Sequence, residues 1–134
     1  MLTVRGLTKR FGEFTAVDDL SFTVEQGQVY GFLGQNGAGK STTIRMLLTL
    51  IKPTAGEITF FGNSLEQHRY AILSQIGAIV EKPDLYKYLT VQEHLNLFAR
   101  FGGRRPNHNR NNDLLQPVGL LERANSRVST YSQG

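Results

Sequence analysis

Hydrophobic and polar positions alternate over two stretches near the start of the chain. Val4 to Leu7 and Ala16 to Val24 are rich in residues that favour strands, and Gly12 supplies a turn between them. One buried face of the second stretch is suggested by Val17, Leu20, Phe22 and Val24. The pattern predicts two strands joined by a hairpin-like connection.

A short apolar run and a longer helical pattern follow, separated by glycines. Residues 29–33 are almost all apolar, which is typical of a strand buried in a sheet. Residues 34–39 contain three glycines that interrupt this run. From Lys40 onward apolar residues recur at helical spacing until Pro53. The sequence therefore predicts a strand, a glycine-rich loop and a helix.

The rest of the chain alternates between strand and helix patterns. We expect a strand over 57–61, a helix over 65–73 and another buried strand over 77–80. Thr90-Val-Gln-Glu93 matches a capping box and predicts a helix from about Thr90 to Phe101. Residues 102–112 are polar and basic, so an exposed linker is expected before a helix that holds Leu114, Leu115 and Val118. The predicted fold class is α/β.

Size and composition exclude several classes of protein. The chain has 134 residues, 40% of them hydrophobic, which suits one globular domain. Its longest apolar runs are too short to span a membrane, and its first residues lack the pattern of a secretory signal, so cytoplasmic residence is expected. The absence of cysteine excludes disulfides and thiol chemistry, and the three histidines match no metal-binding spacing.

The glycine-rich loop is the strongest chemical signal. Gly34-Gln-Asn-Gly-Ala-Gly39-Lys40-Ser41 fits the P-loop pattern G-x-x-x-x-G-K-[ST] between a predicted strand and helix. Glycines let backbone N–H groups wrap a phosphate; Lys40 is expected at the β- and γ-phosphates and Ser41 at Mg²⁺. The candidate nucleotide-binding residues in this loop are Gly34, Gln35, Asn36, Gly37, Ala38, Gly39, Lys40, Ser41 and Thr42. The alternative is a glycine-rich turn that binds nothing.

With these residues in place, the whole chain resembles the nucleotide-binding domain of ABC transporters. The resemblance rests on the P-loop together with Lys9-Arg-Phe11-Gly, Ile76 to Glu81, Leu89 to Glu93 and Thr130 to Gly134. It implies an incomplete P-loop NTPase fold, with residues 1–81 forming the β and P-loop part of the core. Residues 82–134 would hold the Q-loop and the start of the helical subdomain.

The resemblance implies an adenine contact near the start of the chain. Phe11 occupies the position of the family's aromatic loop, where a ring stacks on the base. The alternative is that Phe11 is an ordinary aromatic packed at a strand end, with Phe14 close enough to compete for the adenine.

Two further motifs depart from the family pattern. Glu81 stands where the family has the Q-loop glutamine, which meets Mg²⁺ and senses the transmembrane partner; a plain surface glutamate is the alternative. Tyr131-Ser132-Gln133-Gly134 is similar to the start of the signature motif, with Tyr131 in place of Leu and Gln133 in place of Gly. Ser132 and Gly134 would contact ATP held by the opposite subunit of a head-to-tail dimer; a polar chain end is the alternative.

The function implied by the resemblance is that of an ATP-binding subunit, with ATP and Mg²⁺ as its ligands. The motifs look most like those of drug and bacitracin-type efflux ATPases, which dock on a transmembrane permease at the inner face of the cell membrane. The 134 residues end before the Walker B aspartate and the catalytic glutamate, so we expect the N-terminal part of a longer ATPase that by itself binds nucleotide without efficient hydrolysis. The predicted strand over 29–33 would then present an open edge that favours association.

Two other functions stay open. The chain carries a net charge of +4, and four of its bases lie in a stretch that has no acidic residue between Glu93 and Asp113. These bases are Arg100, Arg104, Arg105 and Arg110. These bases suit a soluble ABC-type ATPase that acts on ribosomes or DNA, because they could contact phosphates. Residues 102–112 contain no aromatic residue (Phe, Trp or Tyr) on which a base could stack, so we expect no nucleic-acid partner. A truncated product that binds nucleotide without turnover is the third interpretation.

Overall fold

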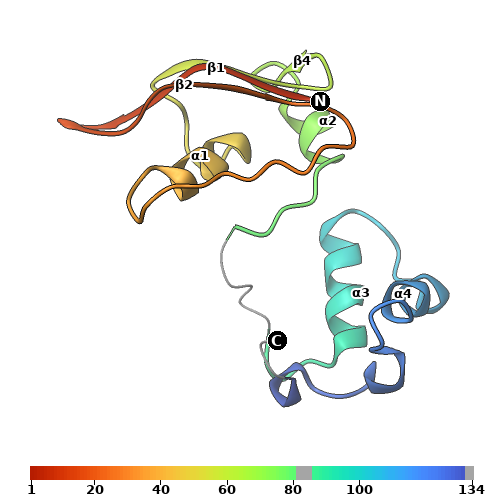
Figure 1. Cartoon of the computed structure of the whole chain (residues 1–134). Coiled ribbons are helices and arrows are strands. Elements are labelled where there is room, and N and C mark those ends of the chain that lie inside the picture. Colours follow the sequence, from red (N-terminus) through yellow and green to blue (C-terminus); the bar gives the residue numbers. More distant parts are fainter. Residues whose placement is uncertain (81–85, 132–134) are drawn as a thin grey trace. The chain divides into compact units, whose positions relative to one another are not determined.

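The computed structural model describes residues 1–80 and 86–131, which belong to two compact units, Met1–Lys82 and Pro83–Gly134 (Figure 1). The assignment of the second unit as the Q-loop and the start of a helical subdomain remains a prediction. Within the described ranges, none of the helices is both long enough and apolar enough to cross a membrane.

The first unit contains an antiparallel sheet in the order β2-β1-β3-β4. The predicted hairpin is confirmed as β1 (Leu2–Phe11) and β2 (Phe14–Val24), and β3 (Ala55–Phe60) and the short β4 (Asn63–Ser64) extend the sheet. The predicted inward residues of β2 are buried or half-buried. Asp19 has φ +46°, and an irregular register here explains why Val17 and Leu20 share a face although they are three positions apart.

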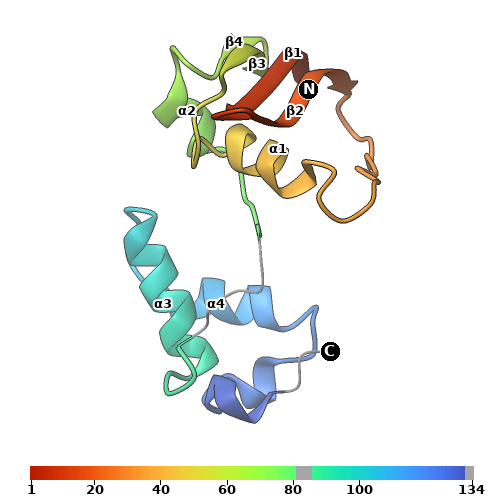
Figure 2. The ribbon, with the colours of Figure 1, turned by 90° about the vertical axis from the view of Figure 1, so that its left-hand side faces the viewer.

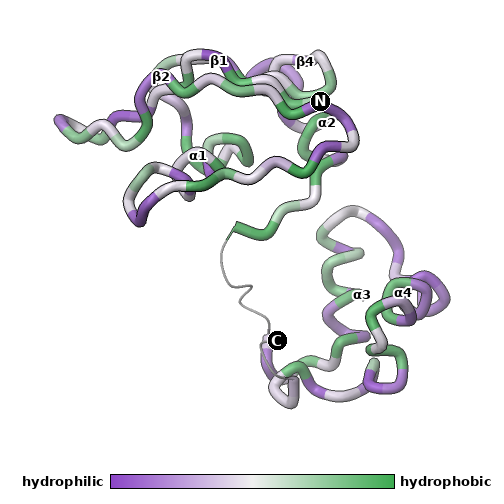
Figure 3. The backbone as a smooth tube through the Cα atoms, in the orientation of Figure 1, coloured by the Kyte–Doolittle hydropathy of each residue, from purple (hydrophilic) through white to green (hydrophobic). Residues whose placement is uncertain are grey.

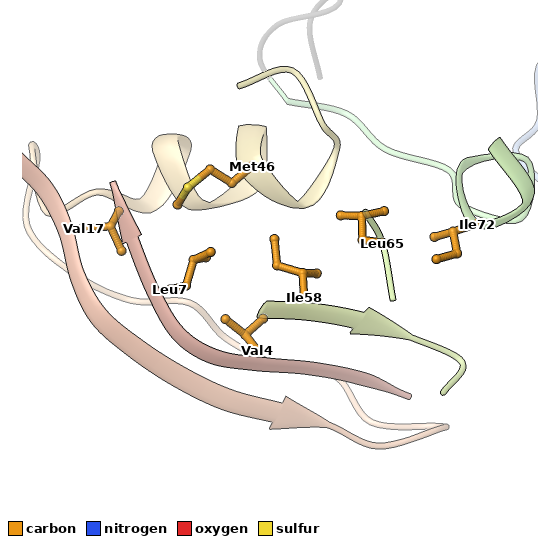
Figure 4. Packing of buried hydrophobic residues seen from close by; sticks show 7 residues of the cluster. All are labelled: Val4, Leu7, Val17, Met46, Ile58, Leu65 and Ile72. Carbon is orange, nitrogen blue, oxygen red and sulfur yellow. The ribbon is translucent and has the colours of Figure 1, made fainter. Parts of the chain in front are cut away.

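Two helices, α1 (Lys40–Leu47) and α2 (Arg69–Leu73), lie on one face of this sheet (Figures 1 and 2). Side chains from the sheet and from α1 and α2 meet in one core, shown in Figure 4. Its buried residues are Val4, Leu7, Val17, Met46, Ile58, Leu65 and Ile72. This core fixes the start of α1, and with it the glycine-rich loop, against β2.

Both helices are shorter than the sequence predicts. The helical spacing continues to Ile51, but α1 ends at Leu47 because Thr49 adopts the left-handed conformation, with φ +57°. The pattern over 65–73 includes Leu65, which lies in a turn instead; its N–H donates to Ile58 O at 2.9 Å. Hydrophobic spacing reports which side chains are buried, and turns can bury them as well as helices.

The two predicted buried strands over 29–33 and 77–80 are wrong for this structure. Neither segment forms a strand, Leu33 is 93% exposed and Ile79 is 80% exposed. A strand requires a neighbour that supplies hydrogen bonds, and none of the residues in the described ranges pairs with either segment. The last described stretch of the first unit is therefore hydrophobic but uncovered (Figure 3).

The second unit consists of short helices. The predicted helix is confirmed as α3 (Val91–Phe101), and both hydrogen bonds of its capping box are present. Further along lie α4 (His108–Leu115) and two 3-10 turns, η1 (Leu121–Arg123) and η2 (Val128–Thr130).

The predicted linker over 102–112 is too long. The α4 helix begins inside it because Asn107 caps the helix, accepting from the N–H groups of Asn109 and Arg110 at 2.9 and 3.2 Å. Leu114 and Leu115 lie on α4, whereas Val118 lies beyond its end. The polar composition concealed a helix whose buried face includes Asn111.

Candidate functional site

The glycine-rich loop lies against β2 at the start of α1. Gly39 is the residue before α1 and has φ +81°, a conformation that favours glycine. A Cβ at this position would collide with the backbone oxygen of Ala16 and the side chain of Val17. The last glycine of the motif is therefore required by the close approach of the loop to the strand.

Hydrogen bonds hold the loop and the first turn of α1 in place. The buried Thr43 donates its N–H to Gly39 O at 2.8 Å and its hydroxyl to the same oxygen at 3.0 Å. Ala38 N–H donates to Gln35 O at 3.1 Å and closes a turn. Motif matching missed Thr43, although its place on the inner face of α1, three residues before the buried Met46, was a usable signal.

Lys40 folds back over the loop. Its ammonium group donates to the backbone oxygens of Gly34 and Gln35 at 2.6 and 2.7 Å. These bonds place a positive charge beside the loop, where α1 has neither a side-chain cap nor an acidic residue in its first turn. The N–H groups at this helix end and the Lys40 charge together favour an anion.

A pocket of about 330 Å³ opens beside these groups. It is lined by Phe14, Ala16, Asn36, Gly37, Gly39, Lys40, Ser41 and Thr42. The glycine backbone, the Lys40 ammonium and the hydroxyls of Ser41 and Thr42 fit a phosphate group, and hydroxyl oxygen is a ligand type that Mg²⁺ accepts. Gly34 and Gln35 do not line the pocket, but their backbone oxygens accept the hydrogen bonds of the Lys40 ammonium. The Ala38 side chain lies beside Gly34.

The structure distinguishes the two aromatic candidates by position. Phe14 lines the pocket and is 63% exposed, whereas Phe11 does not line it. The Phe11 ring lies beneath the Lys9 ammonium, 5.0 Å from ring centroid to nitrogen, and that ammonium also donates to Lys52 O at 2.7 Å. The pairing Phe11↔Phe14 puts both rings at the same end of the hairpin.

A second pocket in the first unit, of about 690 Å³, contains none of the predicted site residues. It lies near the C-terminal end of α1 and β3, and its charged lining includes Lys52 and Glu66, which form an exposed ion pair at 3.9 Å. This pocket lacks the loop amides and hydroxyls of the smaller one, and we assign it no chemistry.

In the second unit, the segment that enters α3 is hydrogen-bonded to the run before the end of the chain. The oxygens of Lys87 and Leu89 accept from the N–H groups of Ser129 and Val128 at 3.1 and 2.9 Å. Tyr131 packs its ring 4.2 Å from the Arg123 guanidinium and donates its hydroxyl to Arg123 O at 2.6 Å. These two contacts hold Tyr131 in place against η1.

Three sequence-predicted site residues, Glu81, Ser132 and Gly134, lie outside the described residues. Among the residues that are described, no group of three or more His, Cys, Asp or Glu side chains could hold a metal ion. Of the two predicted metal contacts, Ser41 lies among the described residues and lines the pocket, whereas Glu81 lies outside them.

Comparisons with known proteins place most of the chain in one family. The family described as "ABC transporter" matches residues 17–134. The chain is 46% identical over 130 residues to the bacitracin transport ATP-binding protein BcrA of Bacillus licheniformis, covering 96% of this chain and 42% of that protein. It is 39% identical over 136 residues to the Nod factor export ATP-binding protein I of Ralstonia nicotianae, covering 100% of this chain and 42% of that protein.

A solved structure supports the same relationship. An ATP binding subunit of an ABC transporter superposes with a TM-score of 0.81 at 32% identity, covering 98% of this chain and 56% of the solved one. The predicted fold class, a partial nucleotide-binding domain of mixed α/β type, is confirmed. The chain spans about two fifths of the length of the two curated relatives named above.

Proposed function

Because the chain belongs to the ABC transporter family, we propose that it binds Mg-ATP through the loop Gly34–Thr42 as part of the ATP-binding subunit of an exporter. The observation that carries this proposal is the pocket beside the loop, where Lys40, the Gly37 and Gly39 backbone and the Ser41 hydroxyl converge. The transport role is supported by the similarity to the bacitracin transport protein BcrA, and the export direction by the similarity to the Nod factor export protein.

Each group in the pocket has a chemical role in this proposal. The loop N–H groups and Lys40 hold the phosphates, and Lys40 exchanges its bonds to Gly34 and Gln35 for the β- and γ-phosphate oxygens. Ser41 contributes a hydroxyl ligand to Mg²⁺, which neutralises phosphate charge when bound. Thr43 keeps Gly39 and the start of α1 in position without touching the ligand.

The partners follow from the family. We propose that a transmembrane permease recruits the protein to the inner face of the cell membrane, and that a second nucleotide-binding domain completes the ATP site head to tail. In this assembly Glu81 would stand near Mg²⁺ and the permease, and Ser132 and Gly134 would contact the opposite subunit's ATP. The 134 residues themselves would bind nucleotide without efficient hydrolysis, because they include no candidate for the glutamate that activates water.

Thermal unfolding with Mg-ATP tests the site. At about 100 times its dissociation constant, the nucleotide should stabilise the chain by about 2.7 kcal/mol, which at this size raises the melting temperature by about 10 °C. Lys40→Ala should abolish most of this shift. Lys52→Ala is the matched control, since its ammonium does not line the pocket and forms an exposed ion pair with Glu66. A folded wild-type chain with no shift would contradict the proposal.

The base contact has its own test. Phe11 matches the family's position, but Phe14 lines the pocket, so Phe11→Ala and Phe14→Ala are compared for Mg-ATP affinity. Loss of a stacking ring should weaken binding by about 1–3 kcal/mol, or about 5- to 150-fold, in one variant and leave the other near wild type. Wild-type affinity in both variants would exclude stacking by either ring.

A further inference from the structure

His94 occupies a buried position between α3 and the segment that enters it. Its side chain is 5% exposed although it lies in the first turn of a helix on the second unit. The Nε2 atom accepts the backbone N–H of Tyr86 at 2.9 Å, and the Nδ1 atom lies 3.2 Å from the backbone oxygen of Thr90. Both ring nitrogens therefore face backbone groups.

These two partners determine where the imidazole carries its hydrogen. A backbone N–H can only donate, so Nε2 must keep its lone pair, and a backbone oxygen can only accept, so Nδ1 must hold the hydrogen. The two contacts therefore fit the Nδ1–H tautomer of the imidazole. A second proton on Nε2 would face the Tyr86 N–H with another donor and remove that hydrogen bond.

The segment held by His94 connects several parts of the second unit. Leu89 N–H closes a turn onto Tyr86 O at 2.9 Å. The following residues pair with the run 126–129: Thr90 with Arg127, and the Leu89 oxygen with Val128 N–H. Residues 86–90 are thus fixed on one side to α3 through His94 and on the other to the run that leads to Tyr131.

We propose that His94 is a proton-sensitive latch for residues 86–90. Neutral His94 holds Tyr86 against α3, and uptake of one proton at Nε2 releases the Tyr86 end of the segment. The exposed ring of Tyr86 moves with it, whereas Lys87 and Leu89 stay bonded to Ser129 and Val128. The inference goes beyond nucleotide binding, because every group that carries it lies in the second unit.

Other titratable and charged groups surround the latch. Glu93 on α3 interacts electrostatically with His94, and Arg127, from the run paired with residues 86–90, interacts with Glu93. Tyr86 and Phe98 place their rings 6.0 and 6.2 Å from the imidazole, centroid to centroid. From α4, His108 places its Nδ1 atom 2.9 Å from the Nε2 atom of Gln92, which lies two residues before His94 on α3.

Nuclear magnetic resonance of the ¹⁵N-labelled 134-residue chain between pH 8 and pH 5 tests the latch. We expect His94 ring nitrogen shifts of the Nδ1–H tautomer at pH 8. As the ring signals of His94 titrate, the opening equilibrium read from Tyr86 amide exchange should rise with falling pH, by at most about tenfold per pH unit for one proton. An Nε2–H tautomer, or Tyr86 protection that does not change while His94 protonates, would overturn the proposal.

Two variants separate His94 from its neighbour. His94→Gln keeps a side-chain acceptor that does not titrate, so Tyr86 protection should become independent of pH. His108→Gln should keep the wild-type response; a response that disappears in His108→Gln and persists in His94→Gln would assign the switch to His108. If His94→Gln does not fold, the ring nitrogen shifts of His94 in the wild-type chain still test the proposal, because they report the tautomer. The Mg-ATP melting shift of His94→Gln should stay at the wild-type value, so failure of the latch and failure of the nucleotide site are distinguished.

Discussion

The two units bury different kinds of side chain. The core of the first unit is made of apolar residues from the sheet, α1, α2 and the turn after β4. The second unit buries Leu115 and Ala124, but it also buries Gln92, His94 and Asn111, which make side-chain hydrogen bonds. Among the described residues, the buried Oε1 atom of Gln92 has no partner. Apolar packing, together with the hydrogen bonds of the buried Thr43 to Gly39 O, therefore positions the glycine-rich loop, whereas polar contacts hold α3, α4 and the segments around them.

This difference has consequences for how each unit responds to change. The stabilisation from apolar burial is non-directional and roughly proportional to the buried area. Truncation of one apolar side chain therefore costs stability through the lost burial and the cavity that it leaves. A buried polar group depends on one partner with one protonation state, and its loss leaves the other group unpaired. We expect the first unit to be sensitive to side-chain volume and the second to hydrogen bonding and pH.

The largest effect is expected in the apolar core. Leu7→Ala removes a side chain with no exposed surface and should lower the free energy of unfolding of the first unit by about 2–5 kcal/mol. Leu50→Ala makes the same chemical change at an exposed position and should cost less than about 0.5 kcal/mol. Chemical denaturation followed by amide signals of β1 measures both, and equal losses would break the contrast between core and surface.

A smaller loss is expected from a polar truncation in the second unit. Asn111 donates its side-chain N–H to Asn96 Oδ1 at 2.9 Å, joining α4 to α3. Asn111→Ala leaves that oxygen without its donor and should cost about 1–3 kcal/mol, detected in α3 amide exchange. Asn112→Ala is the matched control, an exposed neighbour on the same helix. A neutral Asn111→Ala would mean that polar contacts do not hold the two helices together.

The capping box should contribute less again. Thr90 Oγ1 accepts the Glu93 N–H at 3.2 Å, and Glu93 accepts the Thr90 N–H at 2.7 Å. Thr90→Ala should lower the stability of the second unit by about 1 kcal/mol, measured by denaturation monitored at α3. Ser129→Ala, an exposed hydroxyl truncation in the same unit, should change it little. Similar losses of stability in both variants would mean that the capping box makes no specific contribution to the second unit.

The same cap predicts a response to acid. Hydrogen bonds from the Thr90 backbone and then its hydroxyl hold the pKa of Glu93 below its ordinary value of 4.5, and the charge of Arg127 acts in the same direction. A carboxyl with a lowered pKa in the folded state stabilises the fold above about pH 4.5, and this contribution disappears as pH falls through the folded value. Glu93→Gln should flatten this acid limb in α3 stability, and an unchanged limb would contradict the assignment.

The sequence predicted what depends on local chemistry. The hairpin, the capping box of α3 and the position of the glycine-rich loop before a helix each follow from residues close together in the chain. These signals are specific because a glycine in a tight loop, a Thr-x-x-Glu pair and an alternating pattern are each compatible with few local backbone conformations.

Predictions that depended on distant partners were less successful. Residues 29–33 and 77–80 have the composition of buried strands, but composition does not supply the neighbouring strand that pairing requires. The α4 helix was concealed because its buried face is occupied by Asn111 rather than by a full apolar stripe. Phe14 lines the pocket because the hairpin pairs it with Phe11, a register that no motif encodes.

Amide chemical shifts of the ¹⁵N-labelled chain, titrated with Mg-ATP, show directly which residues bind the nucleotide. The nucleotide site predicts large, saturable shifts for Gly37, Gly39, Lys40 and Ser41, their loss in Lys40→Ala and their retention in Lys52→Ala. Shifts that appear instead in residues 86–131, or an absence of any shift while the chain remains folded, would contradict the account.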